Sequence, residues 1–188
     1  MGSFYVNLTV RSDDQSAVAA ALKGRSALVT PAQHGCVVVA DAECDKQDQD
    51  AARSLARMLS RQLSCIVLVV LNHDDDILWY FLTLEGEISD EYDSSPGYFD
   101  PNSEPSAPVG GDAKVLCKAF DSSAALRVEA VLRKSSFDDD GYVFASDRHR
   151  DLVAALEIPN FAVGLGFESI SAGYFPDGIS KEQLLRVS

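Results

Sequence analysis

The segment ILWYFLTLEGEISDEY (residues 77–92) decides the fold, because two strand-like runs in it are joined by a dipeptide that favours a tight reversal. The first run, residues 77–84, is apolar and aromatic, and the second, residues 88–92, mixes apolar and charged side chains. Between them, Glu85 and Gly86 form a two-residue turn of the kind that connects hairpin strands. The sequence therefore predicts an antiparallel hairpin.

The register of this hairpin determines which charged residues meet at its open end. With Glu85 and Gly86 in the turn, Trp79 is expected to lie opposite Tyr92. The segment NHDDD (residues 72–76) then reaches the same end of the sheet as the acids of the second strand. The ionisable residues gathered there are His73, Asp74, Asp75, Asp76, Asp90, Glu91 and Asp93. Tyr98, Phe99 and Asp100 follow directly in the sequence.

The residues before the hairpin alternate between strand-like and helix-like patterns. The order βαββαβ, followed by the hairpin as a β-meander, predicts an α+β protein. Its antiparallel sheet is expected to be of ferredoxin-like type, with both helices on one face. The predicted strands are residues 4–10, 27–30, 36–40 and 65–71. One predicted helix begins after Ser12-Asp13, and the other spans residues 48–63.

The chain changes character at residues 96–111, where several prolines and glycines exclude a helix or a central strand. This segment is predicted to be a loop or linker between an α+β sheet lobe, residues 1–95, and a helix-rich C-terminal lobe, residues 112–188. The sequence leaves open whether the two lobes share one core. The C-terminal half is expected to be mainly helical, with helices at residues 113–120, 122–134 and 147–157 and one or two strands at residues 142–145 and 161–167.

The composition is strongly acidic, with 29 Asp and Glu residues against 16 Lys and Arg residues and a net charge of −13. Such a field repels phosphate backbones and anionic lipids, so we expect neither nucleic-acid nor membrane binding, and basic proteins or divalent cations are favoured. The first residues do not have the pattern of a signal peptide. The four cysteines show no paired spacing, which indicates buried thiols in the reducing cytoplasm. The oligomeric state is left open.

These observations favour a non-catalytic protein-binding or inhibitory module that docks a basic partner. In this hypothesis carboxylates steer the encounter, and exposed aromatic side chains supply affinity. Strand alternation is expected to place Glu91 and Asp93 on one face of the sheet and Asp90 on the other. The sequence contains no assembled catalytic motif. The residues expected to contact the partner are Asp74, Asp75, Asp76, Asp90, Glu91, Tyr92, Asp93, Tyr98 and Phe99.

The alternative is a divalent-metal-dependent ligand-binding protein or hydrolase that uses clustered aspartates. Carboxylates held close together repel one another unless water or a hard cation such as Ca²⁺ or Mg²⁺ neutralises them. The spacing of residues 136–147 resembles an EF-hand loop, although serine stands at its first position and aspartate at its last. The same residues also fit a polar turn before a strand. The candidate metal ligands are Asp138, Asp140, Tyr142 and Asp147, with Tyr142 acting through its carbonyl.

The histidines do not indicate a catalytic set. His149 shares a helical stripe with the apolar residues three, four and seven positions later, which predicts a partly buried packing residue. His34 lies two residues before Cys36, but the sequence shows no third group that would orient a thiol–imidazole pair.

Overall fold

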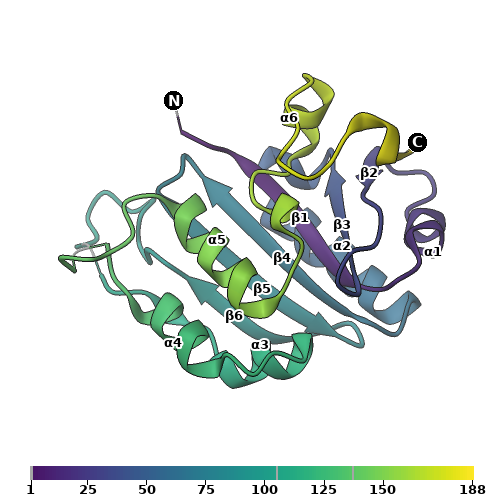
Figure 1. Ribbon diagram of the computed structural model, residues 1–188. Helices are drawn as coiled ribbons and strands as arrows, with labels where there is room; N and C mark the ends of the chain where they lie inside the picture. The colour runs from purple at the N-terminus through teal and green to yellow at the C-terminus, as the bar shows by residue number, and fades with distance from the viewer. Residues whose placement is uncertain (1, 105, 137) are drawn as a thin grey trace.

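The computed structural model describes residues 2–104, 106–136 and 138–188. These residues form an α+β protein built on one eight-stranded antiparallel sheet, with the strand order β7-β6-β5-β4-β1-β3-β2-β8. In Figure 1 the long strands cross the middle of the molecule. The strands are β1 (Tyr5–Arg11), β2 (Ala27–Val29), β3 (Cys36–Asp41), β4 (Ile66–His73), β5 (Ile77–Leu84), β6 (Glu87–Asp93), β7 (Val109–Gly110) and β8 (Leu185–Val187).

Helices cover both faces of the sheet (Figure 1). The two helices of the first half pack on one face, and the helices of the C-terminal half pack on the other. The helices are α1 (Gln15–Ala21), α2 (Gln49–Gln62), α3 (Ala113–Phe120), α4 (Ala125–Arg133), α5 (Ala145–Leu156) and α6 (Phe167–Ser171), with short 3₁₀ turns η1 (Cys44–Lys46), η2 (Asn160–Ala162) and η3 (Lys181–Gln183).

Two hydrophobic clusters, one on each face of the sheet, hold these layers together. Successive side chains of a strand point to opposite faces, so Val6 and Leu8 pack with α1 and α2, while Tyr5 packs on the α5 side. Because both faces are covered, β3, β4 and β5 are apolar almost throughout. The cluster on the α5 side combines residues from both halves of the chain, among them Leu78 and Leu152.

The hairpin of β5 and β6 is confirmed, with Glu85 and Gly86 in its turn. Their φ angles of 52° and 82° lie in the left-handed region that a two-residue hairpin turn of this type requires. Glycine enters this region without strain, which explains why Gly86 occupies the second position. Leu84 pairs with Glu87, as the turn predicts.

The predicted register is wrong beyond the first pairs of the hairpin. A β-bulge between Leu82 and Thr83 shifts the pairing by one residue, so that Trp79 lies opposite Asp93 and not opposite Tyr92. A bulge places one extra residue in one strand and exchanges the side chains that share a face. The sequence pattern does not reveal this shift, because both registers pair aromatic with acidic or aromatic residues.

The strand expected at residues 142–145 is wrong, because Ala145 already belongs to α5. The amide of Ala145 donates a hydrogen bond to the carbonyl of Asp75 at 2.7 Å. This contact with the turn between β4 and β5 starts the helix two residues earlier than the sequence predicts. The short apolar run therefore leads into a helix and does not join the sheet.

The strand expected at residues 161–167 is also wrong. This run forms η2 and a loop, whose carbonyls at Ala162 and Leu165 accept hydrogen bonds from the side-chain amide of Asn7, at 2.8 and 2.9 Å. The buried side chain of Asn7 thus satisfies backbone carbonyls that a neighbouring strand would bond in a sheet. The C-terminal half instead contributes β7 and β8, which are too short to produce a detectable alternation.

The proline-rich residues 96–111 connect β6 to α3 and end in β7, which pairs with β6. Pro105 in this segment lies outside the described residues. The helix predicted at residues 113–120 is confirmed as α3, and those predicted at 122–134 and 147–157 correspond to α4 and α5. The division into two lobes stays a prediction.

Candidate functional site

One of the three aspartates in the turn between β4 and β5 holds α5 in place. Asp75 accepts a hydrogen bond from the amide of Ser146 at 2.7 Å and another from the Ser146 hydroxyl at 3.0 Å. Asn72 donates to the same carboxylate at 3.1 Å. Phe144, which precedes the helix, makes no side-chain capping bond. Asp75 therefore acts as the N-terminal cap of α5 from a distant part of the chain.

Two further residues of the predicted site, Asp90 and Tyr92, are engaged inside the protein. Asp90 accepts hydrogen bonds from the amide of Asp112, before α3, at 3.0 Å and from the Tyr80 hydroxyl at 2.8 Å. Burial raises the pKa of the Asp90 carboxyl against the opposing effect of these bonds. Tyr92 is 1% exposed, and Arg148 donates a hydrogen bond to its hydroxyl. The expectation that Tyr92 is exposed is wrong, because the bulge turns its ring toward the α5 side.

Glu91 lies on the α2 side of the sheet and forms an ion pair with Arg53. The Arg53 guanidinium is also stacked over the rings of Trp79 and Phe81, with its central carbon 4.8 and 5.0 Å from their centroids. Asp90 lies opposite Leu82, whose side chain belongs to the cluster on the α5 side of the sheet. Asp90 and Glu91 therefore lie on opposite faces, and the predicted alternation is confirmed. Glu91 therefore already has a cation of this chain beside it.

An exposed aromatic cluster surrounds His73 at the end of β4. The ring centroids of Phe4 and Phe99 both lie 5.0 Å from that of His73, and that of Tyr98 lies 6.2 Å away. Phe99 is 69% exposed, and Phe4 and Tyr98 are each more than two-fifths exposed. The Tyr98 hydroxyl donates a hydrogen bond to Asp76 at 2.9 Å, which raises the pKa of the phenol. We name as the acidic-aromatic rim the residues Phe4, His73, Asp74, Asp76, Tyr98 and Phe99.

A pocket of about 140 Å³ opens beside this rim and is lined by Trp79, Tyr98 and Phe99. Asp93, the cross-strand neighbour of Trp79, also lines it. Its Oδ1 accepts a hydrogen bond from the Ser95 amide at 2.8 Å, whereas no described residue donates a hydrogen bond to its Oδ2. Burial, assisted by the nearby Glu91 charge, raises the pKa of the Asp93 carboxyl. We call this the rim pocket.

Sequence patterns did not assign Phe4 to the site. Phe4 was expected to begin the first strand, residues 4–10, but it precedes β1 and is exposed. The pairing of Tyr5 with Asn72 between β1 and β4 places the preceding residue, Phe4, next to His73. The pairing of β1 with β4 is therefore the feature that assigns Phe4 to the site.

The side chains of the candidate metal ligands in residues 136–147 each contact another group of the chain, and Phe137 within this segment lies outside the described residues. In the part of the chain that the structure describes, no group of three or more His, Cys, Asp or Glu side chains is placed to hold a metal ion. The metal hypothesis stays a prediction. The observed partners are Ser135 for Asp138, Lys134 for Asp140, Asp151 for Tyr142 and Arg150 for Asp147.

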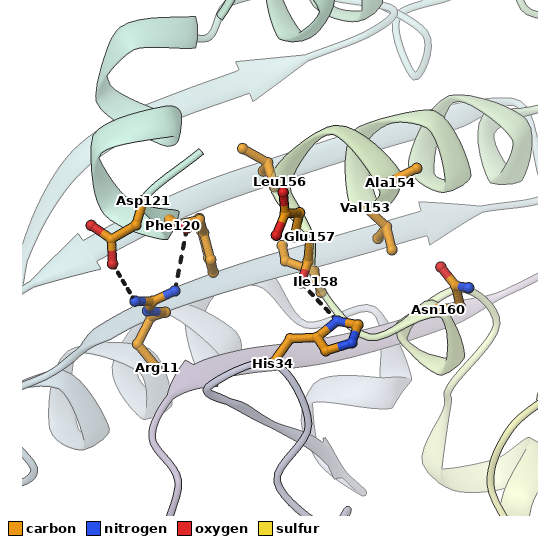
Figure 2. A pocket seen from close by; sticks show the side chains of 10 residues that line it. All are labelled: Arg11, His34, Phe120, Asp121, Val153, Ala154, Leu156, Glu157, Ile158 and Asn160. Atoms are coloured by element: carbon orange, nitrogen blue, oxygen red, sulfur yellow. Dashed lines mark hydrogen bonds and ion pairs between the residues drawn. The ribbon is translucent and has the colours of Figure 1, made fainter. Parts of the chain in front are cut away.

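A wider recess of about 580 Å³ lies where the ends of α3 and α5 approach β1 (Figure 2). Figure 2 shows Arg11 beside Asp121 on one side of the recess and His34 beside Glu157 on the other. Arg11 forms an ion pair with Asp121 at 2.7 Å and donates to the Phe120 carbonyl at 3.4 Å. His34 Nδ1 donates to the Glu157 carbonyl at 3.1 Å. Both side chains therefore cap the C-terminal ends of helices and join them to the sheet.

No helix in the described residues combines the length and the hydropathy that crossing a bilayer requires. No protein-family model, curated protein sequence or solved structure matches this chain. The candidate site is therefore interpreted from its own geometry.

Proposed function

We propose that this protein is a non-catalytic binding module that docks a basic segment of a partner protein at the acidic-aromatic rim. One Lys or Arg side chain of the partner enters the rim pocket. The observation that carries the proposal is the half-buried Asp93 carboxylate, which lines a pocket together with aromatic side chains and has one oxygen to which no described residue donates a hydrogen bond. Aromatic faces and a carboxylate are together the groups that attract an ammonium or guanidinium ion.

The size of the rim pocket suits a single side chain. Its volume of about 140 Å³ equals the space of about five water molecules at about 30 Å³ each. Partial burial of Asp93 disfavours its charged form, and a cation bound beside it would restore that charge. The pocket thus favours an occupant with a positive charge at the tip of a narrow apolar stem, as in lysine.

The predicted binding surface becomes smaller in this proposal. Asp75, Asp90, Glu91 and Tyr92 are engaged within the protein and are left out. The net charge of −13 supplies a long-range field that accelerates the approach of a basic partner and weakens with added salt. The residues of the predicted surface that remain in the proposed site are Asp74, Asp76, Asp93, Tyr98 and Phe99.

We also propose that the protein works in the cytoplasm and that its first half is ferredoxin-like. All four cysteines are free thiols, which supports a reducing compartment. The neighbouring strands β4-β1-β3-β2, with α1 and α2 packed on the same face, support the ferredoxin-like assignment. Both assignments are consistent with a small binding module.

Replacing Asp93 with asparagine is expected to weaken the binding of a lysine–glycine repeat peptide by about tenfold, equal to about 1.4 kcal/mol. Asparagine keeps an oxygen for the Ser95 amide but removes the charge of a side chain that lines the pocket. Because Trp79 is the single tryptophan of the chain and lines the pocket, its fluorescence reports the titration directly.

Glu87→Gln is the matched control, since it removes one exposed carboxylate from the other end of the same strand. We expect this variant to bind like the unmodified protein. The proposal is wrong if Asp93→Asn binds the peptide as tightly as Glu87→Gln does. It is also wrong if raising the salt from about 50 to about 200 mM leaves the affinity unchanged.

Replacing Phe99 with alanine is expected to lower the affinity for the same peptide by about fivefold, because an exposed ring at the rim of the pocket is lost. The ring is 69% exposed, so the free energy of unfolding should change little. Leu126→Ala, which truncates a 90% exposed side chain on α4, is the control. Equal affinities of the two variants would show that the rim does not contact the peptide.

A further inference from the structure

A second pocket, of about 370 Å³, lies over the far edge of the sheet, away from the rim. In Figure 1 the yellow C-terminal segment lies beside α6 and β2, and these elements form the pocket. Ile170, Phe175 and Leu184 line it, together with Leu28 of β2 from the sheet. The volume is at the lower end of the range of about 300–1,000 Å³ for small-molecule sites. We call it the edge pocket.

Two positively charged side chains, Lys181 and Arg186, line the edge pocket. Arg186 lies directly opposite Leu28 in the pairing of β8 with β2, so the two side chains share the face that carries the pocket. The Arg186 guanidinium donates to the Ser171 hydroxyl at 3.4 Å and lies 5.9 Å from the centroid of the Phe167 ring. These contacts hold its charge at the side of the pocket formed by α6.

Neither cation forms an ion pair with any carboxylate of the described chain. This is unexpected in a protein in which acids outnumber bases by 29 to 16. The adjacent Glu182 carboxyl accepts hydrogen bonds from its own backbone amide and from the Ser180 hydroxyl, and these bonds, with a smaller effect of the Lys181 charge, lower its pKa. The edge pocket is therefore a local positive site on an acidic surface.

We propose that the edge pocket binds a small amphipathic monoanion, a carboxylic acid with an apolar body. The carboxylate lies between Lys181 and Arg186, and the apolar body contacts Ile170, Phe175 and Leu184. Arginine donates two parallel hydrogen bonds to a carboxylate, and lysine adds a point charge. The apolar walls exclude a fully polar anion such as phosphate as the preferred ligand, because that ligand would leave them without contacts.

Calorimetric titration with octanoate tests this proposal. We expect saturable binding of one octanoate per chain and, because binding needs the charge, affinity for octanol that is lower by about tenfold or more. Octylammonium has the same chain with the opposite charge and should not compete with octanoate for the edge pocket. Lys181→Gln and Arg186→Gln are each expected to weaken octanoate binding by about tenfold.

Lys118→Gln is the matched control, because Lys118 is an exposed lysine on α3 that also forms no ion pair in the described residues. It should bind octanoate like the unmodified protein. Lys181 is exposed in a short 3₁₀ turn, so its replacement tests the charge even if the Arg186 variant unfolds at lower temperature. The proposal is overturned if octanoate does not bind, if octanol binds equally well, or if Lys181→Gln matches Lys118→Gln.

Discussion

Replacing Asp75 with alanine is expected to lower the free energy of unfolding by roughly 3 kcal/mol, since a charged group that caps a helix and accepts several hydrogen bonds is lost. The variant leaves the Ser146 amide and hydroxyl without their acceptor and frees the Asn72 amide. It also detaches the turn between β4 and β5 from α5, so one loss affects two layers of the fold. Chemical denaturation, monitored by circular dichroism, measures the change.

Asp74→Ala is a close control for Asp75→Ala. Both residues lie in the same turn with positive φ angles, 52° for Asp74 and 62° for Asp75, so alanine introduces similar backbone strain at each. Asp74 is exposed, and its carboxylate forms no ion pair with a described residue. We expect Asp74→Ala to cost about 1 kcal/mol. If the two variants are equally stable, the cap assigned to Asp75 does not stabilise the protein.

Acidification from pH 7 to pH 5 is expected to reduce the contribution of His149 to stability by about 2 kcal/mol. Burial, with a smaller effect of the Arg150 charge, lowers the pKa of His149 to about 3. In the unfolded chain a histidine titrates near about 6.5. Below that pH the unfolded state binds a proton that the folded state excludes. The stabilising effect is therefore complete above about pH 6.5 and is lost as the pH falls toward 3, at about 1.4 kcal/mol per pH unit.

The His149→Gln variant isolates this effect. Glutamine does not titrate, and it retains a polar atom for the hydroxyl of Tyr5, which lies 2.7 Å from Nδ1 of His149. The variant is expected to be less stable at pH 7 and to lose less stability than the unmodified protein between pH 7 and pH 5. Asp45, Asp90 and Asp93, whose pKa values burial raises, act in the opposite direction in both proteins and cancel in the comparison. Parallel stability curves would show that His149 titrates normally.

The cap at Asp75 also explains why a cluster of carboxylates in the sequence is a poor guide to a binding surface. The segment HDDD suggests a single acidic patch, but its residues have separate roles. Asp75 caps a helix, Asp76 accepts a hydrogen bond from Tyr98, and Asp74 is exposed. Sequence alone does not separate these roles, because each depends on an element more than 20 residues away, α5 for Asp75 and the loop after β6 for Asp76.

The long helices and strands were predictable because local patterns specify them. The second helix was expected at residues 48–63 and is present as α2, where Asp48 caps the N-terminus by accepting a hydrogen bond from the Ala51 amide. His149 was expected to be a packing residue and is buried. The two segments that were predicted wrongly are short apolar runs whose backbone is hydrogen-bonded to distant residues. Residues 142–145 end at Ala145, whose amide donates to the Asp75 carbonyl, and residues 161–167 accept hydrogen bonds from the Asn7 side chain.

The sequence by itself determined the class of the fold, the β5–β6 turn, the acidic field and the gathering of aromatic and acidic residues at one end of the sheet. These properties follow from local periodicity, turn chemistry and composition. Tertiary structure alone decided which of those residues are exposed at the surface and which are buried or engaged within the protein. The bulge after Leu82 brings Asp93 beside Trp79 and buries Tyr92, and the pairing of β1 with β4 brings Phe4 to His73. A one-residue change of register moves a side chain to the other face of a sheet, and the packing of two helical layers, rather than any local pattern, selects that register.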